Sequence, residues 1–247
     1  VKNTSMALKK DEWIAKVARP FWEKSTELQD YQLFMRDDPR PVILDPSAFY
    51  SCADGIVLYN KIVKNAQEKV EVKGVPYSID DIMGKDILDG PCLICGVFMT
   101  FADVHINRVP YTSTIEWERL EPITTMNWSM DAQEEKIFGT KIPKGKKVSG
   151  VKNQYLYNNA RMLNTFYVPQ YNYKYYVVQI ADYDVNAILP FATKQRTMIM
   201  QGDRFSFIRW GSQCDIIMPL RKDLKIQPLI GVDYHVEAGV DKIASFI

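Results

Sequence analysis

From residue 42 onward, the chain is divided into short apolar runs that are interrupted by glycine, proline or aspartate. This pattern constrains the fold most, because short runs of β-branched and aromatic residues between turn-forming residues are typical of strands. Few long helical patterns lie between the runs. The sequence therefore predicts an α+β fold with a mostly antiparallel β core and peripheral helices. The clearest strand candidates are residues 56–59, 70–72, 93–99, 175–180, 198–200, 205–209, 215–218 and 226–229.

Helical patterns occur at two places. The first thirty residues have the spacing of an amphipathic helix, with a kink or break expected at Pro20. We favour packing of this helix on its own domain, and a position in a membrane interface stays open. A second, short helix is expected over residues 78–84, capped by Ser78 and ended by Gly84. The apolar residues at four-residue spacing in the first helix are Trp13, Val17 and Phe21.

Length and charge indicate one catalytic domain. The 247 residues are expected to form a helical segment over residues 1–40 and a catalytic domain over residues 41–247. A net charge of +1 argues against nucleic acid as a partner. No run of eighteen apolar residues occurs, and the chain begins at Val1, so a preceding membrane anchor is left open. A cytoplasmic location is expected, with peripheral membrane contact and homo-oligomer formation as open alternatives.

The middle of the chain, residues 111–172, has the least regular pattern, and its lysine-rich residues 141–147 are expected to form an exposed loop. The tyrosines that crowd residues 155–176, after this loop, predict a half-buried sheet face, or alternatively an aromatic wall over a substrate pocket. Cys92 and Cys95 lie in an apolar run and are expected to pack in the core, in a reducing compartment. No metal site is expected, because no second pair with metal-ligand spacing accompanies them.

A Gly-Ser pair, Gly211 and Ser212, lies between two strand-like runs. A serine after a small residue at a strand break can attack the preceding backbone carbonyl, although Gly-Ser alone is a common turn sequence. Such an attack needs a base and a group that orients the base. The chain has two histidines, His105 and His235, and we expect His235 to be a surface or packing residue. Asp54 precedes Gly55, where a tight turn is the simpler interpretation.

Five segments together resemble the landmarks of the phosphatidylserine decarboxylase family. They are MRDDPR at residues 35–40, SCADG at 51–55, VKGVPYS at 72–78, DVHINRVP at 103–110 and the Gly-Ser segment itself. Residues 231–240 also resemble the closing hairpin of these proteins. The resemblance extends from residue 33 to residue 246, nearly the whole chain.

The resemblance implies that the chain cuts itself between Gly211 and Ser212. The hydroxyl of Ser212 would attack the carbonyl of Gly211, and elimination followed by hydrolysis would leave a pyruvoyl group at position 212 as the cofactor. His105 would be the base, and Asp54 would be the orienting carboxylate. The implied activity is decarboxylation of an amino-acid group through a Schiff base, without a metal.

Departures from the family pattern leave the substrate open. Asp182–Ile188 stands where lipid-acting members carry two arginines, and Gln213 follows the serine where arginine, threonine or serine is common. We therefore weigh a phospholipid headgroup, that of phosphatidylserine, nearly equally with a free amino acid such as aspartate, asparagine or tryptophan. A different class also stays open, in which the chain is a non-cleaving, catalytically silent relative that acts as a binding or scaffold protein. Cys52, in place of the usual proline, affects only the approach to the turn.

Overall fold

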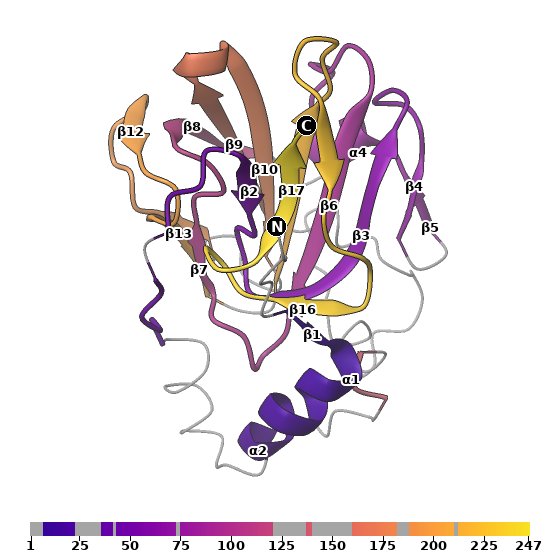
Figure 1. The fold of residues 1–247 in the computed structure, drawn as a ribbon, viewed down its shortest axis with the longest axis vertical. Coiled ribbons are helices and arrows are strands. Elements are labelled where there is room, and N and C mark those ends of the chain that lie inside the picture. The colour runs from indigo at the N-terminus through magenta and orange to yellow at the C-terminus, as the bar shows by residue number, and fades with distance from the viewer. Residues whose placement is uncertain are drawn as a thin grey trace.

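The structure is a computed structural model that describes residues 7–22, 36–41, 43–72, 75–120, 137–139, 160–181, 188–209 and 212–247. Its main element is a nine-stranded sheet with the strand order β1-β16-β3-β6-β14-β10-β9-β8-β12 (Figure 1). All strand pairs within the described residues are antiparallel, which confirms the mostly antiparallel β prediction. In sheet order, the strands are β1 (Leu8–Lys9), β16 (Tyr234–Val236), β3 (Gly55–Val63), β6 (Cys92–Met99), β14 (Ser212–Pro219), β10 (Tyr173–Ala181), β9 (Arg161–Val168), β8 (Ser113–Leu120) and β12 (Thr197–Ile199).

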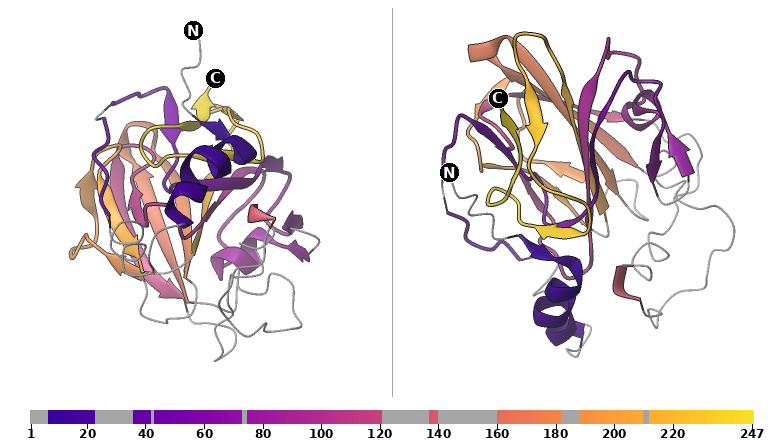
Figure 2. Two further views of the ribbon diagram at one scale, coloured as in Figure 1. Left: turned by 90° about the horizontal axis from the view of Figure 1, so that it is seen from below. Right: turned by 45° about the vertical axis from the view of Figure 1, so that its right-hand side comes forward.

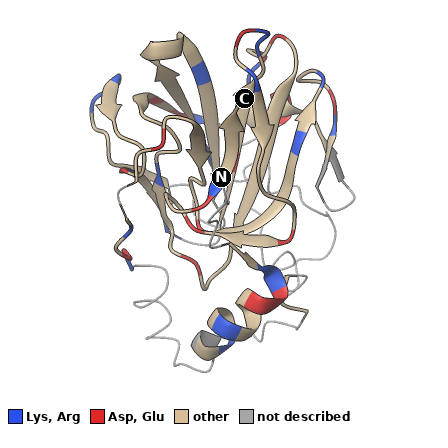
Figure 3. Ribbon diagram, viewed as in Figure 1, with Lys and Arg blue, Asp and Glu red and all other residues tan. Residues whose placement is uncertain are grey.

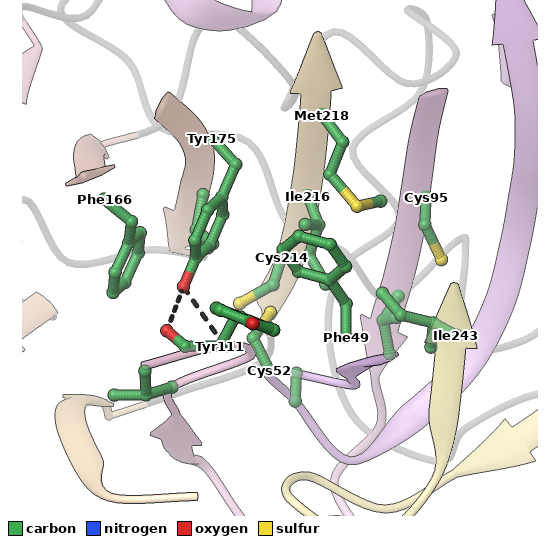
Figure 4. Packing of buried hydrophobic residues seen from close by; sticks show 14 of the residues in the cluster. Phe49, Cys52, Cys95, Tyr111, Phe166, Tyr175, Cys214, Ile216, Met218 and Ile243 are labelled. Carbon is green, nitrogen blue, oxygen red and sulfur yellow. Dashed lines mark hydrogen bonds between the residues drawn. The ribbon is translucent and has the colours of Figure 1, made fainter. Parts of the chain in front are cut away.

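Two three-stranded sheets cover one face of the large sheet. Their buried side chains form one cluster with those of the large sheet, which we call the small-sheet core (Figure 4). Phe166 stacks on Tyr175 in this core, with ring centroids 4.8 Å apart and 3° between the planes. The packing interpretation of the tyrosines is thereby confirmed for Tyr173 and Tyr175, which are buried. One small sheet contains β11 (Ile188–Pro190), β13 (Arg204–Ile208) and β7 (Ile106–Arg108). The other contains β15 (Ile226–Pro228), β17 (Lys242–Phe246) and β2 (Ala48–Tyr50).

Helical residues lie against the opposite face of the large sheet, where a second cluster forms the helix core. Cys92 belongs to this core and Cys95 to the small-sheet core, and both are buried and free. The expected core packing of this pair is confirmed, because residues three apart on a strand face opposite sides. The helical elements are α1 (Lys10–Trp13), the π-helical turn η1 (Ile14–Ala18), α2 (Arg19–Trp22), α4 (Ile79–Met83) and the 3-10 turn η3 (Pro169–Tyr171).

The N-terminal helix extends from Lys10 to Trp22 and lies below β16 in Figure 1, as the views in Figure 2 also show. No break occurs at Pro20. The helix instead widens into a π-helical turn over Ile14–Ala18 just before the proline. Proline cannot donate a backbone hydrogen bond and clashes with the carbonyl four residues back, and a wider turn relieves both problems. Trp13, Ile14 and Ala18 are buried, which confirms the amphipathic pattern.

The second helix has the capping residues that the sequence predicted. The hydroxyl of Ser78 accepts a hydrogen bond from the amide of Asp81 at 3.1 Å, and Asp81 accepts one from the amide of Ser78 at 3.2 Å. Gly84 follows the helix with φ of 65°, a left-handed conformation that favours glycine. The helix therefore has reciprocal side-chain capping at its start and a glycine stop at its end.

Two expectations need correction. Residues 111–172 contain two eight-residue strands, β8 and β9, which pair with each other from Thr114↔Tyr167 to Leu120↔Arg161. Neither is a continuous apolar run, the pattern that predicted the other strands, although the alternation of polar and apolar residues in β8 is itself typical of a half-buried strand. Residues 231–240 do not form a closing hairpin, because β16 pairs with β1 and β3 whereas β17 pairs with β2 and β15. The predicted loop 141–147 and residues 182–187 lie outside the described residues.

Basic and acidic residues alternate along the N-terminal helix, as Figure 3 shows. Lys16 and Glu12 form an ion pair at 2.5 Å one turn apart. Within the described residues, no helix combines the length and the apolar character needed to span a bilayer.

Candidate active site

Ser212 begins β14 in the interior of the large sheet. It pairs with Met99 at the end of β6 and with Ala181 at the end of β10, and it is fully buried. Its hydroxyl donates to the sulfur of Met99 at 3.3 Å. The alternation along β14 turns Ser212 toward the small-sheet core, together with Cys214. Gly211, the other half of the predicted cleavage bond, lies outside the described residues.

His105 immediately precedes β7, the strand that follows β6 along the chain. Its Nδ1 lies 2.9 Å from the backbone carbonyl oxygen of Asp103. Because a carbonyl oxygen only accepts, Nδ1 carries the proton and Nε2 carries the lone pair in the neutral ring. Burial, aided by the charge of Arg36, lowers the pKa of His105 to about 4. The ring is therefore neutral near pH 7, with Nε2 available to accept a proton.

The segment that carries His105 is linked to Ser212 through Asn107 and Met99. In an extended chain, residues two apart point the same way, so His105 and Asn107 lie on one side of the β7 segment. The amide nitrogen of Asn107 lies 3.7 Å from the sulfur of Met99, the atom that the hydroxyl of Ser212 also contacts. The strand that follows His105 therefore packs against the end of β6, where Ser212 pairs.

Asp54 is buried in the tight segment before β3, beside the end of β6. A Cβ atom on the next residue, Gly55, would lie 2.1 Å from the carbonyl oxygen of Phe98, so only glycine allows this approach. One carboxylate oxygen of Asp54 accepts from Arg40 at 2.5 Å, and the other accepts from the amide of Ala238 at 2.7 Å.

Burial raises the pKa of Asp54 to about 6, even though the charge of Arg40 lowers it. The nearby charge of Asp103 acts in the same direction as burial. Arg40 also pairs with Glu237, so its side chain joins two carboxylates. The Asp54 carboxylate is therefore held on both oxygens and titrates close to neutral pH.

Asp103 connects the two histidines. Its backbone carbonyl accepts from His105, whereas its carboxylate lies 2.6 Å from Nε2 of His235. The other carboxylate oxygen accepts from the amide and the hydroxyl of Thr100, each at 2.8 Å. Burial would raise the pKa of Asp103, but His235 and Thr100 outweigh it and the pKa is lowered. A charged Asp103 thus fixes the turn from which His105 projects.

His235 is a packing residue, one of the two roles expected for it. It is 6% exposed and stacks on Trp13 of the N-terminal helix, with ring centroids 4.3 Å apart and 9° between the planes. Its contact with Asp103 spans 132 residues of sequence. Sequence reasoning missed this pair and also missed Arg40 as the partner of Asp54. The only available signals were the segments MRDDPR and DVHINRVP, which contain Arg40 and Asp103.

A cavity of about 290 Å³ opens between the N-terminal helix and these carboxylates. Carboxylates outnumber its two arginines, both of which pair with acidic side chains: Arg36 with Asp38 at 2.9 Å, and Arg40 with Asp54. Leu8, Trp13, Val17 and Ala102 form the apolar part of the wall, and Asp38, Asp54, Asp103, His235, Glu237 and Asp241 complete it. An ammonium group suits such a cavity better than a phosphate does.

Gln213 does not face this site. Alternation along β14 turns it to the other side of the sheet from Ser212, where its amide donates to Tyr59 at 3.0 Å and to Asp215 at 2.8 Å. Tyr59 also donates to Asp215, at 2.6 Å. Burial raises the pKa of Asp215 to about 6. The identity of residue 213 therefore bears on the packing of β14, and it gives no support to the choice between phospholipid and free amino acid.

A buried serine at a strand start and a neutral buried histidine are features of an enzyme suited to proton transfer, and the cavity rich in carboxylates lies beside Asp54 without being lined by either of them. Over residues 31–244, the chain matches the family model described as phosphatidylserine decarboxylase, and it belongs to the phosphatidylserine decarboxylase family. Members of this family are carboxy-lyases that carry a pyruvoyl group derived from a serine.

Curated relatives include proteins named phosphatidylserine decarboxylase proenzyme. That of Syntrophus aciditrophicus is 26% identical over 168 residues, which cover 68% of this chain and 66% of the relative. That of Beijerinckia indica is 29% identical over 206 residues, covering 83% of this chain and 69% of the relative. In Xanthobacter autotrophicus, the relative is 26% identical over 188 residues, which cover 76% of this chain and 63% of the relative. The matched segments thus span about two thirds of the relatives' length, and no solved structure matches the chain.

Proposed function

We propose that this chain is a pyruvoyl-dependent decarboxylase that forms its cofactor by cutting itself between Gly211 and Ser212. The observation that carries the proposal is the position of Ser212, fully buried at the start of β14 and in contact with Met99, whose sulfur also contacts Asn107, two residues after the neutral His105. A serine used only in a surface turn would have no reason to occupy this position. Family membership supports the same reaction.

In the cleavage step, His105 Nε2 takes the proton of the Ser212 hydroxyl as Oγ bonds to the carbonyl carbon of Gly211. The C–N bond of the peptide then breaks, the nitrogen of residue 212 takes up a proton, and an ester links the two residues. Removal of the α-proton of residue 212 expels the carboxylate of Gly211 from the β-carbon. Water adds to the resulting dehydroalanine, and ammonia leaves as the keto group forms. Asp54 is the proposed orienting carboxylate, and Arg40 keeps it in place.

The surroundings of Ser212 fit a pyruvoyl group. Its Cβ would become a methyl group, and the hydroxyl it replaces already lies against the thioether of Met99 in a fully buried environment. An apolar methyl suits this contact better than a hydroxyl does, because a thioether is a weak acceptor. When formed, the pyruvoyl group supplies a ketone that withdraws electrons from an attached amino acid as its carboxylate leaves. His105, which is neutral and shielded from water, is our proposed group for the proton at the former α-carbon.

Two substrate classes stay in the proposal. The names of the relatives favour phosphatidylserine. A free amino acid carries the same ammonium group, which the acidic wall of the cavity beside Asp54 would attract. Both arginines of that cavity already pair with carboxylates, so they favour neither a phosphate nor a second carboxylate.

Denaturing electrophoresis and mass spectrometry of aged protein test the cleavage. We expect two fragments, with the smaller one starting at residue 212 and reacting with carbonyl-specific reagents. A single intact chain of 28.6 kDa after long incubation would instead identify the catalytically silent relative. Carbon dioxide release from phosphatidylserine vesicles, measured beside aspartate, asparagine and tryptophan, then separates the substrate classes. Release from vesicles alone would rule out the free amino acids.

A further inference from the structure

A row of buried polar side chains ends at Ser212. Asn164 on β9, Gln179 on β10 and Asn107 on β7 form the amide row, and Met99 on β6 connects it to Ser212. All five residues are fully buried. Such side chains are costly inside a core unless each bond of the network is made, so a row of this kind calls for an explanation.

The hydrogen bonds fix the direction of the amide row. Asn164 Nδ2 donates to the backbone carbonyl of Val177 at 3.1 Å, and this partner can only accept. The same nitrogen donates to Gln179 Oε1 at 2.9 Å. The nitrogen end of Gln179 must therefore face Asn107, whose Oδ1 accepts at 2.6 Å. It follows that the donating end of Asn107 points toward Met99, and a flipped amide would break the whole row.

Among the described residues, three donors meet at the sulfur of Met99, and the weakest is the thiol of Cys214 at 4.0 Å. Asn107 Nδ2 lies 3.7 Å from Sδ, and the hydroxyl of Ser212 lies 3.3 Å from it. Methionine has three rotatable bonds and adapts readily to its surroundings, so its sulfur has no fixed place unless something holds it. Asn107 supplies such a hold, because its own orientation is set from Asn164 through Gln179.

We propose that the amide row is a positioning device for self-cleavage: Asn107 holds the thioether of Met99, and the thioether sets the rotamer of the Ser212 hydroxyl before attack. The inference rests on the proposed cleavage at Gly211 and Ser212. A weak acceptor suits this role. It keeps the hydroxyl in one orientation, yet releases it to His105 at little cost when the reaction begins. Asn107 acts through Met99 and is a positioning residue, not a catalytic one.

The test uses Asn107→Leu, Met99→Leu and the double variant. Methionine to leucine keeps the volume nearly unchanged in a core. We expect each single variant to slow self-cleavage by about 10- to 100-fold, as small misplacements of reacting groups do. Because Asn107 acts through Met99, the double variant should cleave no more slowly than the slower single variant, within about threefold. Cleavage is followed by intact mass, and folding by thermal unfolding.

Gln201→Leu is the matched control. Gln201 is also a buried amide, and it donates to the backbone carbonyls of Ala48 at 2.8 Å and Pro110 at 3.0 Å. It lies near the start of β8 and the end of β9. It should lower the unfolding temperature and leave the cleavage rate within about threefold of the unsubstituted chain. If Asn107→Leu does not fold, Gln179→Glu replaces it. That change keeps the acceptor for Asn164, removes the donor to Asn107, and should also slow cleavage.

The outcomes are distinct. Slowing in the single variants without further slowing in the double variant supports the inference. It is overturned if Asn107→Leu, or Gln179→Glu in its place, cleaves as fast as Gln201→Leu, or if the two single effects multiply in the double variant. If the unsubstituted chain itself never cleaves, the proposed function fails and the inference fails with it. Cleavage of the unsubstituted chain together with normal cleavage of the variants removes the inference alone.

Discussion

The two faces of β14 differ in chemistry although they share one strand. On the small-sheet side, Ser212 contacts the thioether of Met99, which also contacts the neutral amide of Asn107. On the helix side, Gln213 and Tyr59 donate to Asp215, a buried carboxylate whose pKa is raised. The difference teaches that one strand separates the side on which we propose the reaction from a side whose hydrogen bonds hold the strand in place.

The largest expected effect separates the faces directly. Ser212→Ala removes the nucleophile, so no fragment starting at residue 212 should form in any incubation. Gln213→Leu changes the adjacent residue on the other face and should still cleave, within about tenfold of the unsubstituted rate, because it touches no proposed reacting group. Intact-mass measurements over time report both. Cleavage by Ser212→Ala, or its complete loss in Gln213→Leu, would break the comparison.

The next effect concerns the base. His105→Gln keeps a polar side chain of similar size but cannot take up a proton, so cleavage should slow by about 10² to 10⁴-fold. His235→Gln is its matched control, because it removes the other histidine, which packs on Trp13 and contacts Asp103. We expect the control to cleave faster than His105→Gln by at least about tenfold. Equal rates would mean that both histidines act only through Asp103.

A smaller effect is expected at the carboxylate. Asp54→Asn removes the carboxylate that we propose as the orienting group, and it leaves Arg40 paired with Glu237. We expect cleavage to slow by about 10²-fold. Stability above pH 6 should not fall, because burial raises the pKa of Asp54 to about 6 and its charged form is unfavourable in the folded chain there. Arg40→Met keeps the carboxylate but removes the cation that holds it and lowers its pKa, so it should also slow cleavage at neutral pH. Unchanged cleavage in Asp54→Asn would show that the carboxylate has no role.

The smallest effect is a change in pH dependence on the helix side. The folded pKa of Asp215, about 6, lies above the ordinary value of 3.8. Between these values the folded chain binds more protons than the unfolded chain, so the contribution of Asp215 to stability is present below pH 4 and lost as pH rises through 6. Asp215→Asn should therefore match the unsubstituted chain near pH 4 and exceed it above pH 6.

This gain should reach about 1 to 3 kcal/mol at pH 8. Urea unfolding at several pH values measures it, and the difference between the two chains cancels the contributions that Asp54 and His105 make in both. His105 contributes with the opposite sign, because its lowered pKa favours the folded chain as pH rises from 4 to 6.5. A gain for Asp215→Asn that did not depend on pH would show that folding does not shift the pKa of this carboxylate.

Much of the fold could be predicted from local pattern. β3, β6 and β10 are long, mostly apolar runs, and the capping residues Ser78 and Gly84 indicate α4. The missed strands β8 and β9 are half polar and take their stability from pairing with each other, which no short window of sequence contains. In the site, the motifs pointed to Ser212, His105 and Asp54. Arg40 and His235 could not be assigned their partners, because the contact of His235 with Asp103 depends on the complete fold.

The position of β14 has a consequence for the protein after the cut. The piece that starts at Ser212 contributes β14 to the interior of the large sheet, β16 next to its edge and β17 to the middle of a small sheet. The strands of this fragment therefore form hydrogen bonds with strands of the N-terminal fragment in two different sheets. Cleavage of the peptide bond before Ser212 would therefore leave the two fragments associated. They should co-purify under native conditions and separate only when the protein unfolds.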